Sequence, residues 1–277
     1  MALNLARPDD HAAVPALLNL LGGTGNLGAA VGARPMAEVV RHAQLLGMAA
    51  AFIESERGRQ PPETLDRFGR PGATRTCSGV RVADFSALWA GPLCARLLGL
   101  AGADVVKVES VARPDGARHG NPTFYRHLHH GHGAVVLDFA DRAALRAVVA
   151  DADVVIESSR PRALRRLGLD AERFLAARPG RVWVSVSGYG RDDDRVAFGD
   201  DAAVAGGLVS WQPGGAGPAF LGDALADPVT GIYAARAAAR SLADGGGHLV
   251  SVAMAACAAE LAERAGSAGP GRGSPPC

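Results

Sequence analysis

The chain has 277 residues, of which 48% are hydrophobic and 21% are charged, a composition typical of a soluble globular protein rather than a disordered one. Lys and Arg total 29 and Asp and Glu total 28, so the formal net charge of +1 excludes binding to nucleic acid or to an anionic membrane through bulk charge. The four cysteines are scattered and form no CxxC pair, so we expect free thiols in a cytoplasmic protein.

The first 79 residues differ in character from the rest. Residues 1–55 are rich in Ala and Leu, and their apolar spacing predicts a small helical element. The stretch 11–33 has no charged side chain, but Pro15 and the pair Gly22-Gly23 interrupt it, so neither a membrane-spanning helix nor a signal peptide is predicted. Residues 56–79 are polar and rich in Arg, Pro and Gly, which predicts a linker.

From residue 80 onward, short apolar segments alternate with helical patterns. The segments predicted as strands are 80–85, 104–108, 134–139, 153–157 and 181–187, and those predicted as helices are 93–100, 142–149 and 161–167. Strands this apolar are buried on both faces, which is typical of parallel sheets between two layers of helices. The pattern predicts a doubly wound, mostly parallel α/β domain over residues 80–262.

The last third of the chain contains one further helix and strand. Asp227-Pro228 predicts a helix start with Asp227 as the N-cap, and the helix is expected to end near residue 242. Three consecutive glycines at 245–247 predict a turn into a strand at 248–252. Residues 263–277 are predicted to form a disordered tail.

Four histidines lie close together in the sequence, at positions 127, 129, 130 and 132. A metal site requires ligands that converge, whereas adjacent side chains mostly point in different directions and no acidic or Cys partner is nearby. We therefore predict no metal site and interpret the cluster as a solvated loop, with contact to phosphate or adenine as the alternative. The phosphate-binding and hydrolase motifs GxGxxG, GxxxxGK[ST], GxSxG and HExxH do not occur in a convincing context.

Several short motifs follow one another in a characteristic order along residues 80–262. They are SALWAGP (86–92), GADVVKVE (102–109), LD (137–138), ADVVIE (152–157), RP (160–161), LGL (167–169), SGYG (187–190) and DPVTG (227–231). This ordered set resembles the family III CoA-transferases, which include formyl-CoA transferase, carnitine CoA-transferase and α-methylacyl-CoA racemase.

The resemblance implies a Rossmann-like domain, an acyl-CoA and a carboxylic acid as substrates, and no permanently bound cofactor. It also implies interlocked chains, so we expect a homodimer or pairing with a complementary chain. Asp227 takes the place of the acyl-accepting carboxylate. The CoA contacts that the resemblance implies are Trp89, Ala90, Ser110, Leu137, Asp138, Phe139, Ala140, Ser158, Ser159, Arg160 and Arg166.

Simpler interpretations compete for three of these residues. Asp before Pro at a helix start is often only a cap, and Asp223 is a nearby rival for the catalytic role. Trp89 suits core packing as well as a ligand site, because aromatic side chains dominate both. Arg166 lies in an Arg-rich helix that suits a solvated face.

The sequence also departs from the family pattern. His132 and Gly133 stand where the family has a basic pair, and Ser110 stands where it has an arginine. The segment Gly199-Asp200-Asp201 lacks the histidine that racemase members carry, so a transferase that works through an aspartyl anhydride and thioester is favoured over a racemase. A non-catalytic CoA-binding protein is the third hypothesis. Residues 1–55 resemble part of the family's small domain.

Overall fold

A computed structural model describes residues 1–23, 25–159, 161–212, 214 and 217–267. These residues form two compact units. The first unit comprises residues 1–60, 195–225 and 255 onward, and the second comprises residues 61–194 and 226–254.

The second unit is built on a seven-stranded sheet with the order β3-β11-β8-β7-β4-β5-β6. β3 is the only antiparallel member and pairs with β11 at one edge. The strands are β3 (Glu63–Arg67), β4 (Arg81–Asp84), β5 (Asp104–Ser110), β6 (Gly133–Leu137), β7 (Val154–Glu157), β8 (Val182–Ser187) and β11 (His248–Ala253).

The chain order of the six parallel strands reverses at β4. From β4 the chain adds β5 and then β6 on one side, and β7, β8 and β11 on the other. This is the 3-2-1-4-5-6 order of the doubly wound fold, whose ligands bind outside the carboxyl ends of the strands at the reversal point. The prediction of a mostly parallel, Rossmann-like sheet is confirmed.

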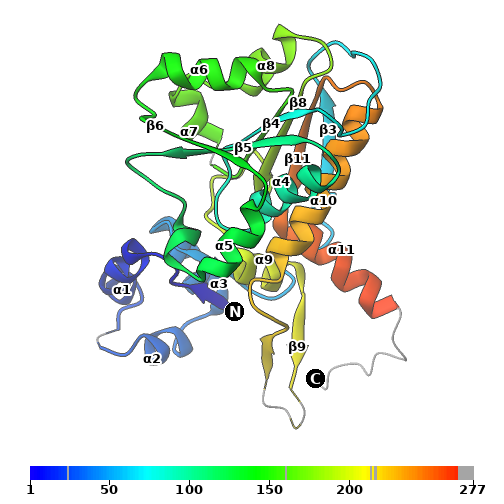
Figure 1. The fold of residues 1–277 in the computed structure, drawn as a ribbon. Helices are drawn as coiled ribbons and strands as arrows, with labels where there is room; N and C mark the ends of the chain where they lie inside the picture. Colours follow the sequence, from blue (N-terminus) through cyan, green and yellow to red (C-terminus); the bar gives the residue numbers. More distant parts are fainter. Residues whose placement is uncertain (24, 160, 213, 215–216, 268–277) are drawn as a thin grey trace. The chain divides into compact units, whose positions relative to one another are not determined.

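Helices cover both faces of this sheet (Figure 1). One face packs against α6, α7 and α8 through a core that includes Phe85, Leu145, Val155, Phe174 and Trp183. The other face carries α4 and α10, which lie against each other. The helices are α4 (Ala90–Leu100), the short 3₁₀ helix η1 (Gly116–His119), α5 (Pro122–His129), α6 (Arg142–Asp151), α7 (Pro161–Arg166), α8 (Ala171–Ala177) and α10 (Ala226–Ala243).

The first unit is mainly helical and contains two small antiparallel pairs, β1 with β2 and β9 with β10. Its first three helices pack around Leu17, Val39 and Met48. The elements are β1 (Ala2–Asn4), α1 (Pro8–Leu20), α2 (Leu27–Gly32), α3 (Met36–Leu45), β2 (Ala49–Ala51), α9 (Gly199–Gly206), β9 (Val209–Trp211), β10 (Pro218–Phe220) and α11 (Met254–Ser267).

Several predicted boundaries differ from the structure. Residues 63–67, expected in a linker, form β3, because this polar segment lies at a sheet edge where one side of the strand needs no partner. Residues 195–225 and 255–262 group with the first unit rather than with the sheet. α11 extends to Ser267, past the predicted start of the tail, and residues 268–277 lie outside the described residues.

No helix among the described residues is both long enough and apolar enough to cross a bilayer.

Gly231 allows α10 to approach α4 closely. A Cβ atom at this position would lie 2.8 Å from the carbonyl oxygen of Ala90 and 2.9 Å from Cβ of Leu93. Only glycine avoids these contacts, so the glycine of the DPVTG motif has a packing role next to the first turn of α4.

We expect Gly231→Ala to lower the free energy of unfolding by about 1–3 kcal/mol, because overpacking outweighs the gain of roughly 1 kcal/mol in helix propensity. Urea unfolding measures this change. Gly32→Ala is the matched control, because a Cβ at this helical glycine meets nothing within 4 Å. Equal stability of Gly231→Ala and the wild type would show that the two helices separate without cost.

Candidate functional site

The reversal point of the sheet brings two loops together at its carboxyl edge. Residues 86–89 follow β4, and Ser158 and Ser159 follow β7. The backbone N–H of Ala87 donates a hydrogen bond to Oγ of Ser158 over 3.1 Å. The loop that leads to Trp89 and Ala90 is therefore tied directly to the loop that carries two of the predicted CoA contacts.

A buried ion cluster supports the 86–89 loop from beneath. Lys107 in β5 is 2% exposed, and its Nζ lies 3.0 Å from Oδ2 of Asp115 and 3.8 Å from Oδ2 of Asp84. The same ammonium group donates to the carbonyl oxygen of Ser86. Asp84, which is fully buried, accepts from the backbone N–H of Ser86 over 2.9 Å and from its hydroxyl. The loop backbone is thus held by a buried cation and a buried anion.

Leu88 has a backbone conformation that leucine rarely adopts. Its φ is +69°, in the left-handed region that disfavours a side chain with a Cβ atom. Its N–H donates to Oδ1 of Asp115 over 3.0 Å, and its side chain is 41% exposed. Strain of this kind persists only where the surroundings impose it, and it clusters at functional sites.

Glu109 connects the ion cluster to the next segment. Its carboxylate accepts hydrogen bonds from Nε and Nη2 of Arg118, at 2.9 and 2.5 Å, and from the Tyr125 hydroxyl at 3.2 Å. The bonds from Arg118 lower the pKa of Glu109 to about 2, and burial raises the pKa of Tyr125 to about 12. Glu109 also accepts from the N–H of Asp115 over 2.9 Å, so the segment that supplies Asp115 is fixed in place.

Asp227 lies at the second position of α10 and is half-buried. The prediction that it is the N-cap is corrected, because the helix already begins at Ala226. Asp227 is one turn before Gly231, and residues four apart share a helix face. Since Gly231 touches the Ala90 carbonyl, the face that carries Asp227 is turned toward the start of α4. Asp223 is exposed and belongs to the other compact unit.

Trp89 and Ala90 begin α4. Trp89 is the N-cap residue and is half-buried, and its ring lies edge-on to Phe124 with ring centroids 4.9 Å apart. Ala90 is buried beneath Gly231. The Trp89 ring packs against α5, and part of its surface stays exposed at the carboxyl edge of the sheet. Both interpretations, core packing and a ligand contact, are therefore compatible with its position.

The other predicted CoA contacts follow β5, β6 and β7. Ser110 ends β5 opposite Leu137 of β6, and the N–H of Val111 donates to the Leu137 carbonyl over 2.9 Å. Asp138 and Ala140 are exposed, and Oδ1 of Asp138 accepts from the N–H of Ala140 over 2.8 Å. This turn leaves the end of β6 open to solvent.

The remaining predicted contacts do not form one cluster. Phe139 is half-buried and its ring packs at 6.1 Å from that of Phe85, so it belongs to the core more than to the surface. Arg166 is exposed at the end of α7. Arg160 lies outside the described residues.

The roles of the buried charged side chains were not predicted from the sequence. Asp84, Lys107 and Glu109 interrupt otherwise apolar strands, and this is the signal that could have revealed them, because buried charges need partners. Glu157 at the end of β7 is a further example. It accepts from the Trp183 indole over 3.2 Å, and burial raises its pKa.

The four histidines divide into two pairs. His127 and His130 are exposed, whereas the rings of His129 and His132 turn inward, with centroids 5.9 Å apart. No hydrogen bond to the ring nitrogens of His129 or His132 is found within the described part of the chain, and burial lowers the pKa of His132 to about 4. Within that part of the chain, no three His, Cys, Asp or Glu side chains gather in a way that could hold a metal ion.

The two aspartates of the Gly199-Asp200-Asp201 segment hold backbone in the first unit. Oδ1 of Asp201 accepts from the N–H of Phe198 over 2.7 Å, and Oδ1 of Asp200 accepts from the N–H of Ala224 over 2.8 Å. The Asp201 carboxylate thus caps the start of α9, whereas the Asp200 carboxylate holds the backbone at Ala224.

Residues 77–269 match the family model described as CoA-transferase family III, and the chain belongs to this family. It is 30% identical to a succinate–glutarate CoA-transferase of Agrobacterium fabrum over 188 residues, covering 60% of this chain and 47% of that protein. It is 28% identical to a formyl-CoA:oxalate CoA-transferase of Rhodopseudomonas palustris over 198 residues, covering 65% and 46%. The chain thus spans about half the length of these relatives.

The fold is also similar to that of solved structures, again over part of their length. A CAIB/BAIF family protein from Brucella suis superposes with a TM-score of 0.63 at 27% identity, covering 70% of this chain and 57% of that one. The family expected from the ordered motifs is therefore confirmed.

We expect Lys107→Met to lower the free energy of unfolding by about 3–5 kcal/mol, because it leaves two buried carboxylates without their cation. Lys107→Arg should also destabilise, since the larger guanidinium has no space at this fully enclosed position. Urea unfolding tests both variants. Arg113→Met, at an exposed position, is the control and should change stability by less than about 0.5 kcal/mol. Wild-type stability of Lys107→Met would show that the ammonium group does not compensate the carboxylates.

Proposed function

We propose that this protein transfers coenzyme A from an acyl-CoA to a carboxylic acid, with Asp227 as the group that accepts the acyl chain. The observation that carries the proposal is the position of Asp227. Its carboxylate is on the first turn of α10, on the face that Gly231 presses against the start of α4. The loop before α4 is the one tied to β7 at the reversal point of the sheet, where ligands of this fold bind.

The chemistry requires one carboxylate and no external energy source. The Asp227 carboxylate attacks the thioester carbonyl, the C–S bond breaks, and an acyl-aspartyl anhydride forms with release of the CoA thiolate. The thiolate then attacks the aspartyl carbonyl, which gives an aspartyl-CoA thioester and frees the first acid. The acceptor carboxylate attacks that thioester, and the same two steps run in reverse. Thioester energy is conserved, so ATP is not consumed.

The start of α10 favours this role physically. The positive end of a helix dipole stabilises an anion in the first turn. The hydroxyl of Thr230 donates to the Ala226 carbonyl over 2.6 Å, which braces that turn. A carboxylate on this braced turn would hold the nucleophile and the thioester in one geometry, and such positioning lowers the barrier of the attack.

Binding of CoA is assigned to the loops at the carboxyl edge. The proposed contacts lie at the carboxyl ends of parallel strands or in the loops directly after them: Trp89 and Ala90, Ser110, residues 137–140, and the serines 158 and 159. Arg160 and Arg166 are the cationic members of the proposed set. We also propose that the chain works in the cytoplasm as a homodimer or with a complementary chain, for which light scattering at several protein concentrations is the direct test.

A non-catalytic CoA-binding protein is the second candidate. The observation that favours it is the inward orientation of His132, which stands at a position where the family has a basic side chain. A neutral, half-buried imidazole contributes little attraction to phosphate.

We expect Asp227→Asn to abolish CoA transfer, with a loss of several orders of magnitude in kcat, because the amide cannot form the anhydride. CoA binding should survive. The measurements are transfer from a short acyl-CoA to free carboxylates, and mass spectrometry of the protein after incubation with acyl-CoA. Asp223→Asn is the matched control and should retain both activity and the covalent adduct.

Two outcomes would contradict the transferase. Near wild-type turnover of Asp227→Asn, with slightly lower thermal stability, would leave Asp227 as a structural residue only. If the wild-type protein neither transfers CoA nor forms an adduct, yet CoA raises its melting temperature, the non-catalytic binder becomes the better description.

A further inference from the structure

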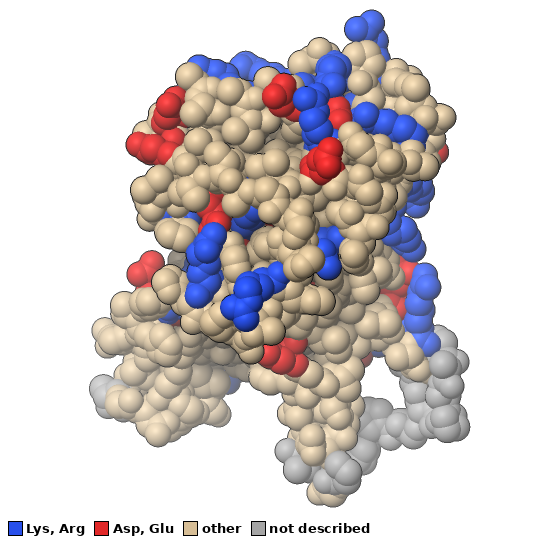
Figure 2. All heavy atoms as spheres, in the orientation of Figure 1, with Lys and Arg blue, Asp and Glu red and all other residues tan. Residues whose placement is uncertain are grey.

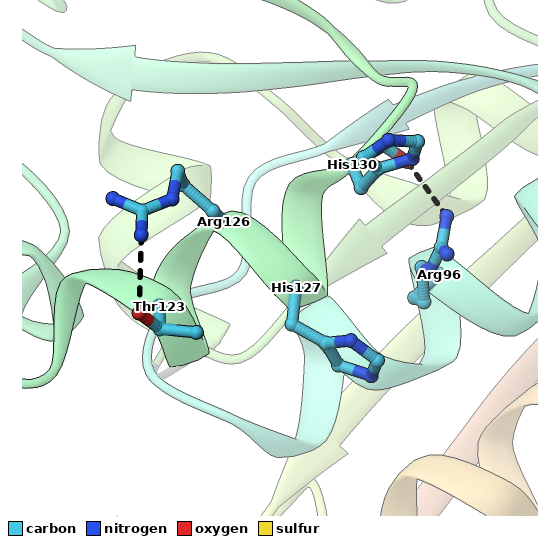
Figure 3. Close-up of a pocket in the computed structure, with 5 residues that line it drawn as sticks. All are labelled: Arg96, Thr123, Arg126, His127 and His130. Atoms are coloured by element: carbon cyan, nitrogen blue, oxygen red, sulfur yellow. Dashed lines mark hydrogen bonds between the residues drawn. The ribbon is translucent and has the colours of Figure 1, made fainter.

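A basic pocket lies between α4 and α5, away from the loops assigned to CoA. It has a volume of about 410 Å³ and is lined by Arg96, Thr123, Arg126, His127 and His130. The last four follow the spacing i, i+3, i+4 and i+7, so they lie along one face of α5 and its end. Arg96 comes from α4 opposite them (Figure 3).

The two arginines of the pocket are held in place without being neutralised. Nη1 of Arg96 donates to the His130 carbonyl over 2.7 Å, and Nη2 of Arg126 donates to the Thr123 hydroxyl over 3.0 Å. Both acceptors are uncharged. Neither guanidinium has an acidic partner within the described ranges, and Nε of Arg96 is buried without a hydrogen bond there. Arg118 nearby is different, because Glu109 neutralises it.

Fixed and uncompensated guanidinium groups in a hollow are the components of an anion site. Arginine forms its strongest hydrogen bonds with carboxylate and phosphate, and it prefers bidentate contact. None of the lining residues is acidic, so a bound anion would meet no repulsion from them. Basic side chains also stand over the region of α5 in the space-filling view (Figure 2).

The arrangement favours an anion with two charged groups. In Figure 3, Arg96 and His130 stand at one end, Arg126 and Thr123 at the other, and His127 lies between them. Residues 123 and 130 are seven positions apart, so this face of α5 extends over roughly 10 Å. A single small anion satisfies one end only, whereas a longer polyanion contacts both.

This pocket is distinct from the proposed catalytic edge. Arg96 is six residues into α4, which places it about 9 Å along the helix from Ala90. His130 precedes β6, so it lies near the amino end of that strand, whereas the CoA loops follow the carboxyl ends.

We propose that the pocket between α4 and α5 is a binding site for a small phosphate-bearing polyanion of the diphosphate class. The site needs no catalytic step, and it stands whether or not Asp227 is a nucleophile.

Isothermal titration calorimetry with inorganic diphosphate, orthophosphate and glutarate, in a buffer free of phosphate, tests the proposal. Diphosphate should bind with a stoichiometry of one. It should bind more tightly than orthophosphate, because it is longer and can contact both ends of the pocket, and more tightly than glutarate, because it carries more negative charge for the two guanidinium groups. Arg126→Ala and His127→Ala are exposed positions, so the fold should be retained, as thermal melting will verify. Arg126→Ala should weaken diphosphate binding about tenfold or more. Arg173→Ala, an exposed arginine on α8, is the matched control and should bind like the wild type.

CoA binding to the variant separates this site from the proposed active site. CoA also carries a diphosphate, so its affinity is compared between Arg126→Ala and the wild type, and the variant should still bind CoA as tightly as the wild type while it loses affinity for diphosphate. Equal loss of CoA and diphosphate binding in Arg126→Ala, or equal diphosphate binding to Arg126→Ala and the wild type, would overturn the proposal. Tighter binding of glutarate than of diphosphate would show that the pocket selects dicarboxylates instead.

Discussion

The second unit depends on one buried ammonium group. Lys107 is the only lysine among 29 basic residues, and it is almost completely enclosed. All the other 28 residues in this count are arginines. The lysine at this position therefore indicates that the buried site accommodates a compact ammonium group, because a guanidinium is larger and planar. Desolvation of Lys107 is offset by Asp84, Asp115 and the Ser86 carbonyl together. Each of these partners belongs to a different segment, so the ion cluster joins β4, β5, the 86–89 loop and the segment that carries Asp115.

The ion cluster fixes the position of the segments that form the candidate site. The loop at 86–89 accepts a strained Leu88 because Asp115 holds its N–H while Lys107 holds Asp115. α4 starts directly after that loop, and Gly231 seats α10 on the first turn of α4. The position of Asp227 therefore follows from the ion cluster through two close contacts, and preorganisation of this kind is what a nucleophile and a bound thioester require.

The sequence predicted more of the fold than of the site. Strands such as VVIE at 154–157 and VWVSVS at 182–187 consist mostly of apolar residues, which indicates burial on both faces. The parallel sheet was therefore predictable. β3 was not, since ETLDR has no apolar alternation and pairs only as an edge strand. The ion cluster was not predictable either, because Asp115 meets Lys107 through a loop that no local pattern describes. The N-cap assignment of Asp227 was wrong by two residues, which is within the usual uncertainty of helix ends.

Charges in this unit fall into two groups with different consequences. Lys107, Glu109 and Arg118 are compensated by neighbours, and such groups fix backbone because separating a buried pair is costly. Arg96 and Arg126 are fixed by a carbonyl and a hydroxyl, so their charge is retained for an external partner. α4 takes part in both arrangements, since its first turn packs against Gly231 of α10 while its middle carries Arg96. An anion that stiffens the α4–α5 contact would therefore act on the same helix that positions the candidate nucleophile, and this gives the two sites a physical route for coupling.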